Sequence, residues 1–205
     1  MRALIVLVVL WLPAWGQSDF RRHTFTANLG SALPKQDLEP FFEQSFMAGG
    51  SYGYRFLRYF QADGGLDVVF GAARVRDFLD VGFPLRIRDR QYFANFGGRA
   101  ILPLARDRVH FFGGGGGSYM RYAEVLDQPF DYARFACDVC DARDGWGYYA
   151  LAGANLALDR GQHFRVGFTS KMYGGHTDGQ GLGPLPGIRS KDRWLMFAGT
   201  VSFSF

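Results

Sequence analysis

The chain has 205 residues, enough for one domain, with 23 lysines and arginines against 19 aspartates and glutamates. Its formal net charge of +4 is small and its basic residues are scattered, so the composition argues against a nucleic-acid partner. Glycine is frequent, at 28 residues, and 17% of the residues are aromatic. The glycines are interleaved with the aromatic residues, a combination that suits strands facing lipid better than a low-complexity segment.

The first 16 residues are a segment of their own. Arg2 supplies a positive start, an apolar run extends from Ala3 to Leu12, and Ala14-Trp15-Gly16 places small residues two apart. This pattern is typical of a secretory signal peptide cleaved after Gly16. An uncleaved anchor is the alternative, although the run is too short to span a bilayer as a helix. We therefore expect a signal peptide over 1–16 and one exported domain over 17–205.

From residue 23 onward, apolar residues recur at every second position, the period of a β-strand. The segments with this pattern are 23–30, 44–57, 61–70, 91–102, 108–120, 146–158, 162–173 and 194–205. Long loops are expected at 31–43, 71–90, 121–144 and 174–190, and short turns at 58–60, 103–107 and 159–161. Long and short connections alternate, as they do in membrane-spanning antiparallel barrels. The register of Gly113–Gly117 stays open, because glycine does not indicate which way a strand faces.

Charges within the predicted strands avoid the apolar face. The charged residues that lie on the same strand face as the small or polar residues are Arg55, Asp63, Asp67, Arg99, Arg165 and Lys171. A charge that faced lipid at the membrane midplane would cost about 2–4 kcal/mol. We predict that these side chains face the lumen and plug it as a network of acidic and basic groups. A narrow pore for small solutes is the alternative.

Aromatic residues gather near both ends of the predicted strands. One set lies beside the long loops (Tyr92, Trp146, Tyr148 and Tyr173, with Met172), and the other beside the short turns (Phe56, Tyr59, Phe60, Phe111, Phe164, Phe203 and Phe205). Two such sets predict girdles at the two membrane interfaces. The simpler alternative is that aromatic residues are merely good strand formers.

The last strand carries the most specific signal. It ends on Val201-Ser202-Phe203-Ser204-Phe205, with aromatic residues at alternate positions and a final phenylalanine. With the signal peptide and the alternating loop lengths, this terminus makes residues 17–205 resemble the small eight-stranded outer-membrane β-barrel proteins of the OmpA/OmpX-like superfamily.

That resemblance implies an all-β fold, an eight-stranded antiparallel up-and-down transmembrane β-barrel whose last strand pairs with the first near 24–29. It implies a monomer in the cell outer membrane, in contact with lipid and lipopolysaccharide, with a structural or surface-interaction role through its long loops. It also implies that Val201, Phe203 and Phe205 are the signal read by the barrel assembly machinery.

Two loop features suggest chemistry. Cys137 and Cys140 are two residues apart in one long loop, where a disulfide is expected in an oxidising compartment. Free or metal-binding thiols and a redox pair are the alternatives, although a zinc site would need two more ligands. The arginines of the long loop 71–90 suit lipopolysaccharide phosphates, with a merely solvated loop as the simpler interpretation; they are Arg74, Arg76, Arg86, Arg88 and Arg90.

No catalytic constellation emerges from the spacing. Neither His110 nor His163 has a serine two residues away, so no nucleophile and base can be paired. The run Gly113–Gly117 lacks the Gly-Lys-Ser/Thr of a phosphate-binding loop. We therefore predict no enzymatic activity, no catalytic residue, no metal and no cofactor. The other classes kept open are a lipid-modifying barrel enzyme and a secreted soluble ligand-binding barrel.

Overall fold

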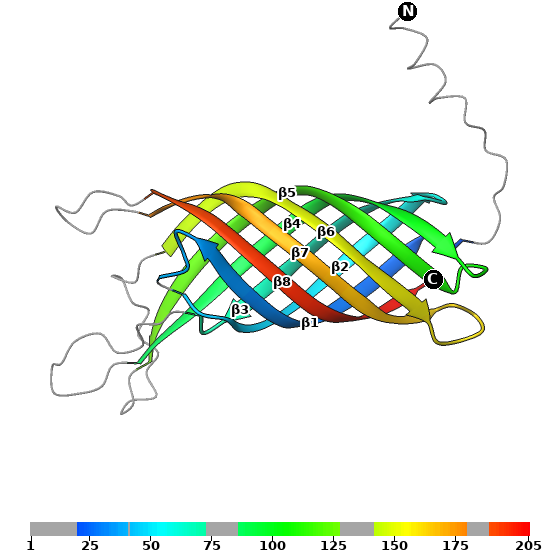
Figure 1. The fold of residues 1–205 in the computed structure, drawn as a ribbon, viewed down its shortest axis with the longest axis horizontal. Coiled ribbons are helices and arrows are strands. Elements are labelled where there is room, and N and C mark those ends of the chain that lie inside the picture. The colour runs from blue at the N-terminus through cyan, green and yellow to red at the C-terminus, as the bar shows by residue number, and fades with distance from the viewer. Residues whose placement is uncertain (1–19, 41, 73–85, 128–141, 180–188) are drawn as a thin grey trace, which may run out of the picture.

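The computed structural model describes residues 20–40, 42–72, 86–127, 142–179 and 189–205. Its strands are β1 (His23–Gln36), β2 (Ser45–Leu57), β3 (Phe60–Phe70), β4 (Arg86–Leu104), β5 (Val109–Asp127), β6 (Ala142–Ala157), β7 (Phe164–Gly179) and β8 (Arg189–Ser204). They form a closed antiparallel barrel in sequence order, with strands strongly tilted to the barrel axis (Figure 1). The predicted eight-stranded up-and-down barrel is therefore confirmed. Among the described residues, no helix is long and apolar enough to cross a membrane.

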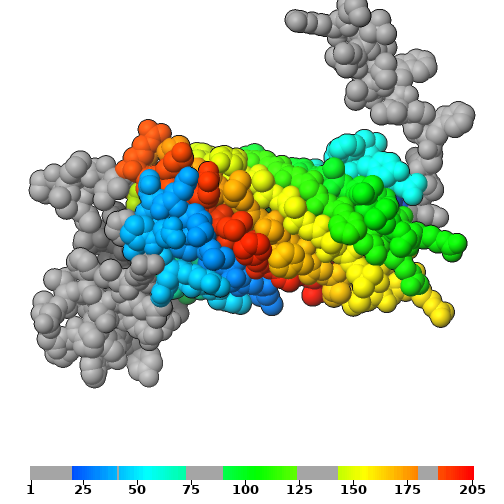
Figure 2. Space-filling model, in the orientation of Figure 1, coloured from blue at the N-terminus to red at the C-terminus, as the bar shows by residue number. Residues whose placement is uncertain are grey.

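The barrel closes where the last strand meets the first. Thr24 of β1 lies opposite Ser204 of β8, and the pairing continues to Gln36 opposite Asp192. Figure 2 shows β8 (red) lying between β1 (blue) and β7 (orange). The backbone groups of His23 and Phe205 exchange two hydrogen bonds of 3.0 Å, so the seam extends to the final residue. The apolar terminal strand thus has neighbours on both sides, which removes the open edge that would otherwise invite aggregation.

The two ends of the barrel differ. The turns after β2, β4 and β6 are short and lie at the same end as the C-terminus (Figure 1). We call this the short-turn end, and the opposite end, from which β1, β3, β5 and β7 lead into longer connections, the long-loop end. The alternation of long and short connections predicted from the sequence is present.

Six strands extend further toward the long-loop end than the sequence pattern predicted. β1 continues to Gln36 instead of residue 30, and β5 continues to Asp127 instead of residue 120. β4, β6, β7 and β8 are longer in the same direction. The expected loop bounds were wrong because charged and proline residues were taken as loop signals. The hydrogen bonds between strands are made by backbone groups and do not depend on the polarity of the side chains. A strand therefore continues for as long as its neighbours pair with its backbone.

The glycine run of β5 has a defined register. Gly113 pairs with Ala100 of β4 and Gly117 with Phe96. A Cβ added at Gly116 would lie 2.2 Å from the Phe96 carbonyl oxygen, whereas one at Gly113 would meet only the Leu151 carbonyl oxygen, at 3.8 Å. Glycine at position 116 therefore permits a close approach of β4 and β5 that a larger residue would prevent.

Candidate functional site

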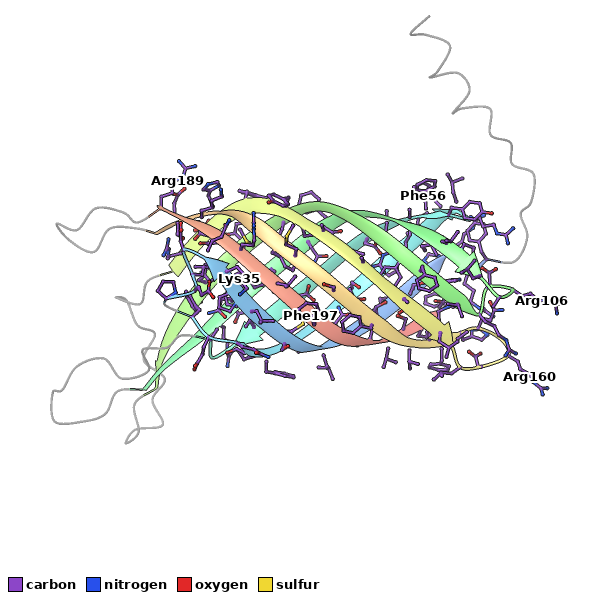
Figure 3. All side chains as sticks on the ribbon, viewed as in Figure 1. Lys35, Phe56, Arg106, Arg160, Arg189 and Phe197 are labelled. Carbon is purple, nitrogen blue, oxygen red and sulfur yellow. The ribbon has the colours of Figure 1, made fainter. Side chains whose placement is uncertain are left out.

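The outer wall of the barrel is apolar around its whole circumference. Every strand contributes large side chains that are more than one third exposed, among them Phe25, Phe46, Leu66, Phe96, Phe111, Trp146, Phe168 and Val201. Figure 3 places one of these outer residues, Phe197 of β8, near the middle of the barrel's length. A continuous belt of this size is far larger than the apolar patches that soluble monomers expose.

Charged residues mark one border of this belt. Arg90 of β4 and Arg121 of β5 are exposed on the outer face toward the long-loop end. Between Tyr92 and Leu102, the outward positions of β4 carry no charge. Ten residues at about 3.3 Å each, tilted by about 40°, span roughly 25 Å along the barrel axis. This height matches the apolar band of outer-membrane barrels.

The predicted aromatic girdles need one correction. Trp146 and Tyr148 are 65% and 49% exposed on the outer wall toward the long loops, as expected. Phe56 and Phe60 are also exposed, and Figure 3 places Phe56 at the short-turn end. Tyr173, however, is completely buried in the lumen. It shares strand parity with Lys171, and that parity, rather than its aromatic character, decides which way it faces.

Aromatic and methionine side chains fill the long-loop half of the lumen. The ring of Phe93 lies 4.8 Å from that of Tyr173, 5.9 Å from Trp194 and 6.3 Å from Tyr122. The Trp194 indole donates a 3.0 Å hydrogen bond to the Tyr122 hydroxyl. Phe42, from the connection between β1 and β2 at the long-loop end, packs against Trp194 and Tyr122. Fully buried methionines complete this layer: Met47, Met120 and Met196.

A buried carboxylate lies next to this layer. Asp67 has no exposed surface and accepts a 2.7 Å hydrogen bond from the Lys171 ammonium group. The Tyr173 hydroxyl donates to the same carboxylate oxygen at 2.5 Å, and Asn95 in turn donates to that hydroxyl at 2.8 Å. Asn28 approaches the other oxygen at 3.5 Å. The carboxylate is thus neutralised by one ion pair and oriented by two neutral side chains.

The other charged residues predicted to face the lumen do so, in separate groups. Asp63 accepts 2.6 Å hydrogen bonds from the Arg99 guanidinium and from Gln61. Arg55 and Arg165 form no such pair and donate instead to the backbone carbonyls of residues 58 and 107. Hydrogen bonds therefore join two acid–base pairs and leave two arginines bound to turns. The sequence pattern placed these side chains inside but contained no information on their partners.

A polar cluster lies at the long-loop end of the lumen, and the sequence analysis missed it. Asp192 is buried and accepts 2.5 Å hydrogen bonds from Thr177 and Ser190. Arg143 donates to the Ser190 hydroxyl at 2.7 Å. Arg143, Thr177 and Ser190 fell in predicted loops, and Asp192 fell between a predicted loop and the last predicted strand, so their parity was not considered. Extending the alternation of β8 backward from Trp194 would have placed Asp192 inside.

The remaining predicted sites lie mostly outside the described residues or side chains. The signal-peptide segment 1–16, the loop residues Arg74 and Arg76, and both Cys137 and Cys140 fall outside the described ranges. Arg86 and Arg88 belong to β4, but only their backbone is described; Arg90 is exposed at the long-loop side of the belt. In the described ranges, no group of three or more His, Cys, Asp or Glu side chains is placed to hold a metal ion.

The C-terminal residues proposed as an assembly signal lie on the outer wall. Val201, Phe203 and Phe205 are 57%, 39% and 50% exposed. The Phe205 ring stacks on His23 at 5.3 Å and contacts Phe203 at 5.9 Å. In the folded barrel these side chains therefore belong to the apolar belt at the short-turn end.

Comparison with known proteins supports the architecture. No family model matches the sequence, and no curated protein sequence matches it. Among solved structures, Neisserial surface protein A (NspA) aligns with a TM-score of 0.59 at 12% identity, over 89% of this chain and 97% of that one. Ail, the attachment invasion locus protein of Yersinia pestis in complex with the heparin analogue sucrose octasulfate, aligns with a TM-score of 0.55 at 10% identity, over 91% and 100%. At such low identity, the likeness shows a shared fold, that of the small eight-stranded outer-membrane barrels.

Proposed function

We propose that the protein is an integral outer-membrane β-barrel, filled by its own side chains, with a structural or surface-interaction role at its long-loop end. The observation that carries this proposal is that charged side chains lie inside the barrel and apolar side chains outside, the reverse of a soluble protein. Lys171 and Asp67 are buried inside, while Phe96 and Phe197 face outward. A soluble barrel would bury its apolar face and expose its charges, so this arrangement fits lipid as the surrounding medium.

The orientation of the barrel in the membrane follows from the different lengths of the connections at its two ends. In outer-membrane barrels the short turns face the periplasm and the longer loops face outward. Both ends of the barrel domain, at His23 and Phe205, then lie on the periplasmic side. The outward end carries Arg90, and with the neighbouring arginines it would meet lipopolysaccharide phosphates. Val201, Phe203 and Phe205 would be read by the barrel assembly machinery before folding, and export would follow cleavage near Gly16.

The filled lumen favours a closed barrel over a pore. The Phe93, Trp194 and Tyr122 rings contact one another across the long-loop half. Below them, the ion pair of Asp67 with Lys171 bridges β3 and β7. An eight-stranded barrel has just enough interior for side chains. Planar-bilayer recordings of the purified protein should therefore show no steady conductance, and a stable unitary current would favour the narrow pore.

The surroundings of three of the four described histidines also favour a non-enzymatic role. His23 bonds the Tyr52 hydroxyl, and His163 bonds Arg21 and a backbone carbonyl, so neither is paired with a serine hydroxyl. His110 lies 3.4 Å from Asp107. A serine nucleophile activated by a base would need that direct contact. Unchanged lipid A masses after expression of the protein would agree with this assignment, and a lost or added acyl chain would refute it.

The decisive experiment places a charge on the belt. Phe197→Arg should destabilise the folded barrel in lipid by about 2–4 kcal/mol. The control Phe197→Ala loses the same ring contact with Phe168 (6.2 Å) without adding a charge. A soluble barrel predicts the opposite order, since arginine on its surface would be harmless. Cell fractionation with a heat-modifiability gel completes the test, because release of wild-type protein without detergent would refute the membrane assignment.

A further inference from the structure

The short-turn end of the lumen contains a cavity of about 320 Å³. Its walls come from strand ends and from two turns, with Asp107 contributed by the turn after β4 and Arg160 by the turn after β6. Figure 3 places Arg160 at this end, beyond the last residues of the strands. The cavity is separate from the aromatic layer, which occupies the opposite half of the lumen.

The described lining of this cavity is strongly basic. Five arginines border it, against one carboxylate, that of Asp107; they are Arg21, Arg55, Arg99, Arg160 and Arg165. Of these, Arg99 is neutralised by Asp63, which lies deeper in the lumen. Arg165 is close enough to Arg21 and Arg55 for their like charges to repel, while Asp107 and Asp159 attract it. The cavity therefore concentrates positive charge that its own acidic group does not balance.

The arginines are held in place by neutral groups. Arg55 donates its Nε–H to the Arg58 carbonyl oxygen at 2.8 Å, and Arg165 donates to the Asp107 carbonyl oxygen at 2.9 Å. Arg21 donates to the Gly161 carbonyl oxygen at 2.7 Å. Backbone carbonyls fix the guanidinium planes without neutralising them, and the Asp107 carboxylate offsets only part of the charge of Arg55 and Arg165. This combination of fixed geometry and excess charge is what a preorganised anion site requires.

One buried guanidinium nitrogen at the cavity has no hydrogen-bond partner. Arg165 is only 6% exposed, and its second terminal nitrogen, Nη1, makes no hydrogen bond. His110 is equally buried, and its Nε2 faces the Asp107 Oδ1 atom at 3.4 Å, so these two atoms answer each other and leave Arg165 Nη1 as the unpaired donor. A buried donor without a partner costs about 1–3 kcal/mol, and more when it is charged. A bound acceptor would remove that cost.

We propose that this cavity binds a phosphate-type oxyanion. Arg55 from β2 and Arg165 from β7 both line it, from strands separated by β1 and β8, and a tetrahedral oxyanion can accept hydrogen bonds from both forks at once. The cavity is large enough for a phosphate with a small organic substituent. The same chemistry is presented by free phosphate and by the glycerol phosphate headgroup of a phospholipid. Binding itself does not depend on the membrane orientation proposed above.

Calorimetric titration of the processed protein in detergent tests this assignment. Inorganic phosphate should bind saturably with a dissociation constant at or below about 1 mM, and Arg165→Met should weaken binding at least ten-fold. Arg106→Gln is the matched control, because Arg106 lies at the same end of the barrel without lining the cavity (Figure 3); its affinity should stay within two-fold of wild type. Glycerol 3-phosphate separates the sources: much tighter binding than inorganic phosphate indicates a lipid headgroup, and equal binding indicates free phosphate.

Three results would overturn the proposal: no saturable phosphate binding by wild-type protein, unchanged binding in Arg165→Met, or an equal loss in Arg106→Gln. A heat-modifiability gel shows whether each variant is folded. Arg55→Met, on a different strand of the cavity lining, gives a second variant with the same expected loss. Should neither variant fold, the wild-type titration alone decides, since it needs no substitution.

Discussion

The ion pair between Lys171 and Asp67 offers the sharpest test of how the lumen is held together. Both groups are buried, at 6% and 0% exposure, and the ammonium nitrogen lies 2.7 Å from the carboxylate oxygen. Lys171→Met keeps the length of the side chain and removes its charge. Asp67→Asn keeps the shape of the acceptor and removes the opposite charge. The two single variants and their combination form a double-mutant cycle.

The magnitudes follow from what each variant leaves unpaired. Removing one partner of a buried pair costs about 3–5 kcal/mol, because the other charge stays in the low-dielectric interior. In Lys171→Met, the Tyr173 hydroxyl and Asn28 still donate to Asp67, so we expect about 3 kcal/mol. The double variant buries no charge and loses only neutral hydrogen-bond strength, about 1–2 kcal/mol. The two single losses should therefore sum to much more than the loss in the double variant.

Urea unfolding in lipid vesicles, followed by tryptophan fluorescence, measures these differences. With a slope of about 2 kcal/mol per molar urea, each single variant should unfold about 1.5 M earlier than wild type. The coupling energy should have the size seen for residues in direct contact, at least about 2 kcal/mol. A coupling below about 0.5 kcal/mol would mean that the two sites act independently, and the pairing described here would then be wrong.

Three further predictions concern the barrel wall and its ends. Gly116→Ala should destabilise the barrel by about 1–3 kcal/mol through overpacking against the Phe96 carbonyl, whereas Gly113→Ala should change urea stability little; equal effects would refute the close approach. Desolvation acts to raise the pKa of Asp159 in the turn after β6, but hydrogen bonds from backbone N–H groups outweigh it and lower that pKa. The carboxylate therefore stabilises the fold above its ordinary pKa of about 3.9, and this stability is lost as the pH falls through the lowered folded value. Asp159→Asn should therefore show a smaller loss of stability than wild type on acidification below pH 4, and parallel curves would contradict this. Deleting Phe205 should abolish insertion in cells but permit refolding in detergent if its role is assembly, while equal loss in both would assign it a structural role.

Strand parity explains why the fold was predictable. A period of two, read across eight segments, separated the apolar wall from the lumen because each face has a different solvent. Arg55 and Lys171 were placed inside by this rule alone, and the structure buries both. Tyr173 shows how the prediction failed. Its aromatic character suggested an interface, although its parity with Lys171 already placed it in the lumen.

Other features had no signal in the sequence pattern. Strand ends were misplaced because Asp192 and Arg143 resemble loop residues, yet both lie in paired strands whose hydrogen bonds are indifferent to side-chain charge. Partners inside the lumen depend on how far each strand is shifted against the next. That shift brings Asp67 of β3 to Lys171 of β7, 104 residues later. Alternation along one strand contains no information about it.

The charge distribution in the lumen argues for a function rather than for stability alone. Buried ion pairs seldom stabilise a protein more than well-packed apolar residues would, and the long-loop half shows that this barrel can be filled with Phe93, Trp194 and methionines. The pair formed by Asp63 and Arg99 is at least neutralised. Arg55 and Arg165 form no ion pair: the Asp107 carboxylate attracts both, but Arg55 repels Arg165 and both guanidinium groups are buried. Two fixed, buried and only partly neutralised guanidinium groups around one cavity carry an electrostatic cost that a bound oxyanion would offset.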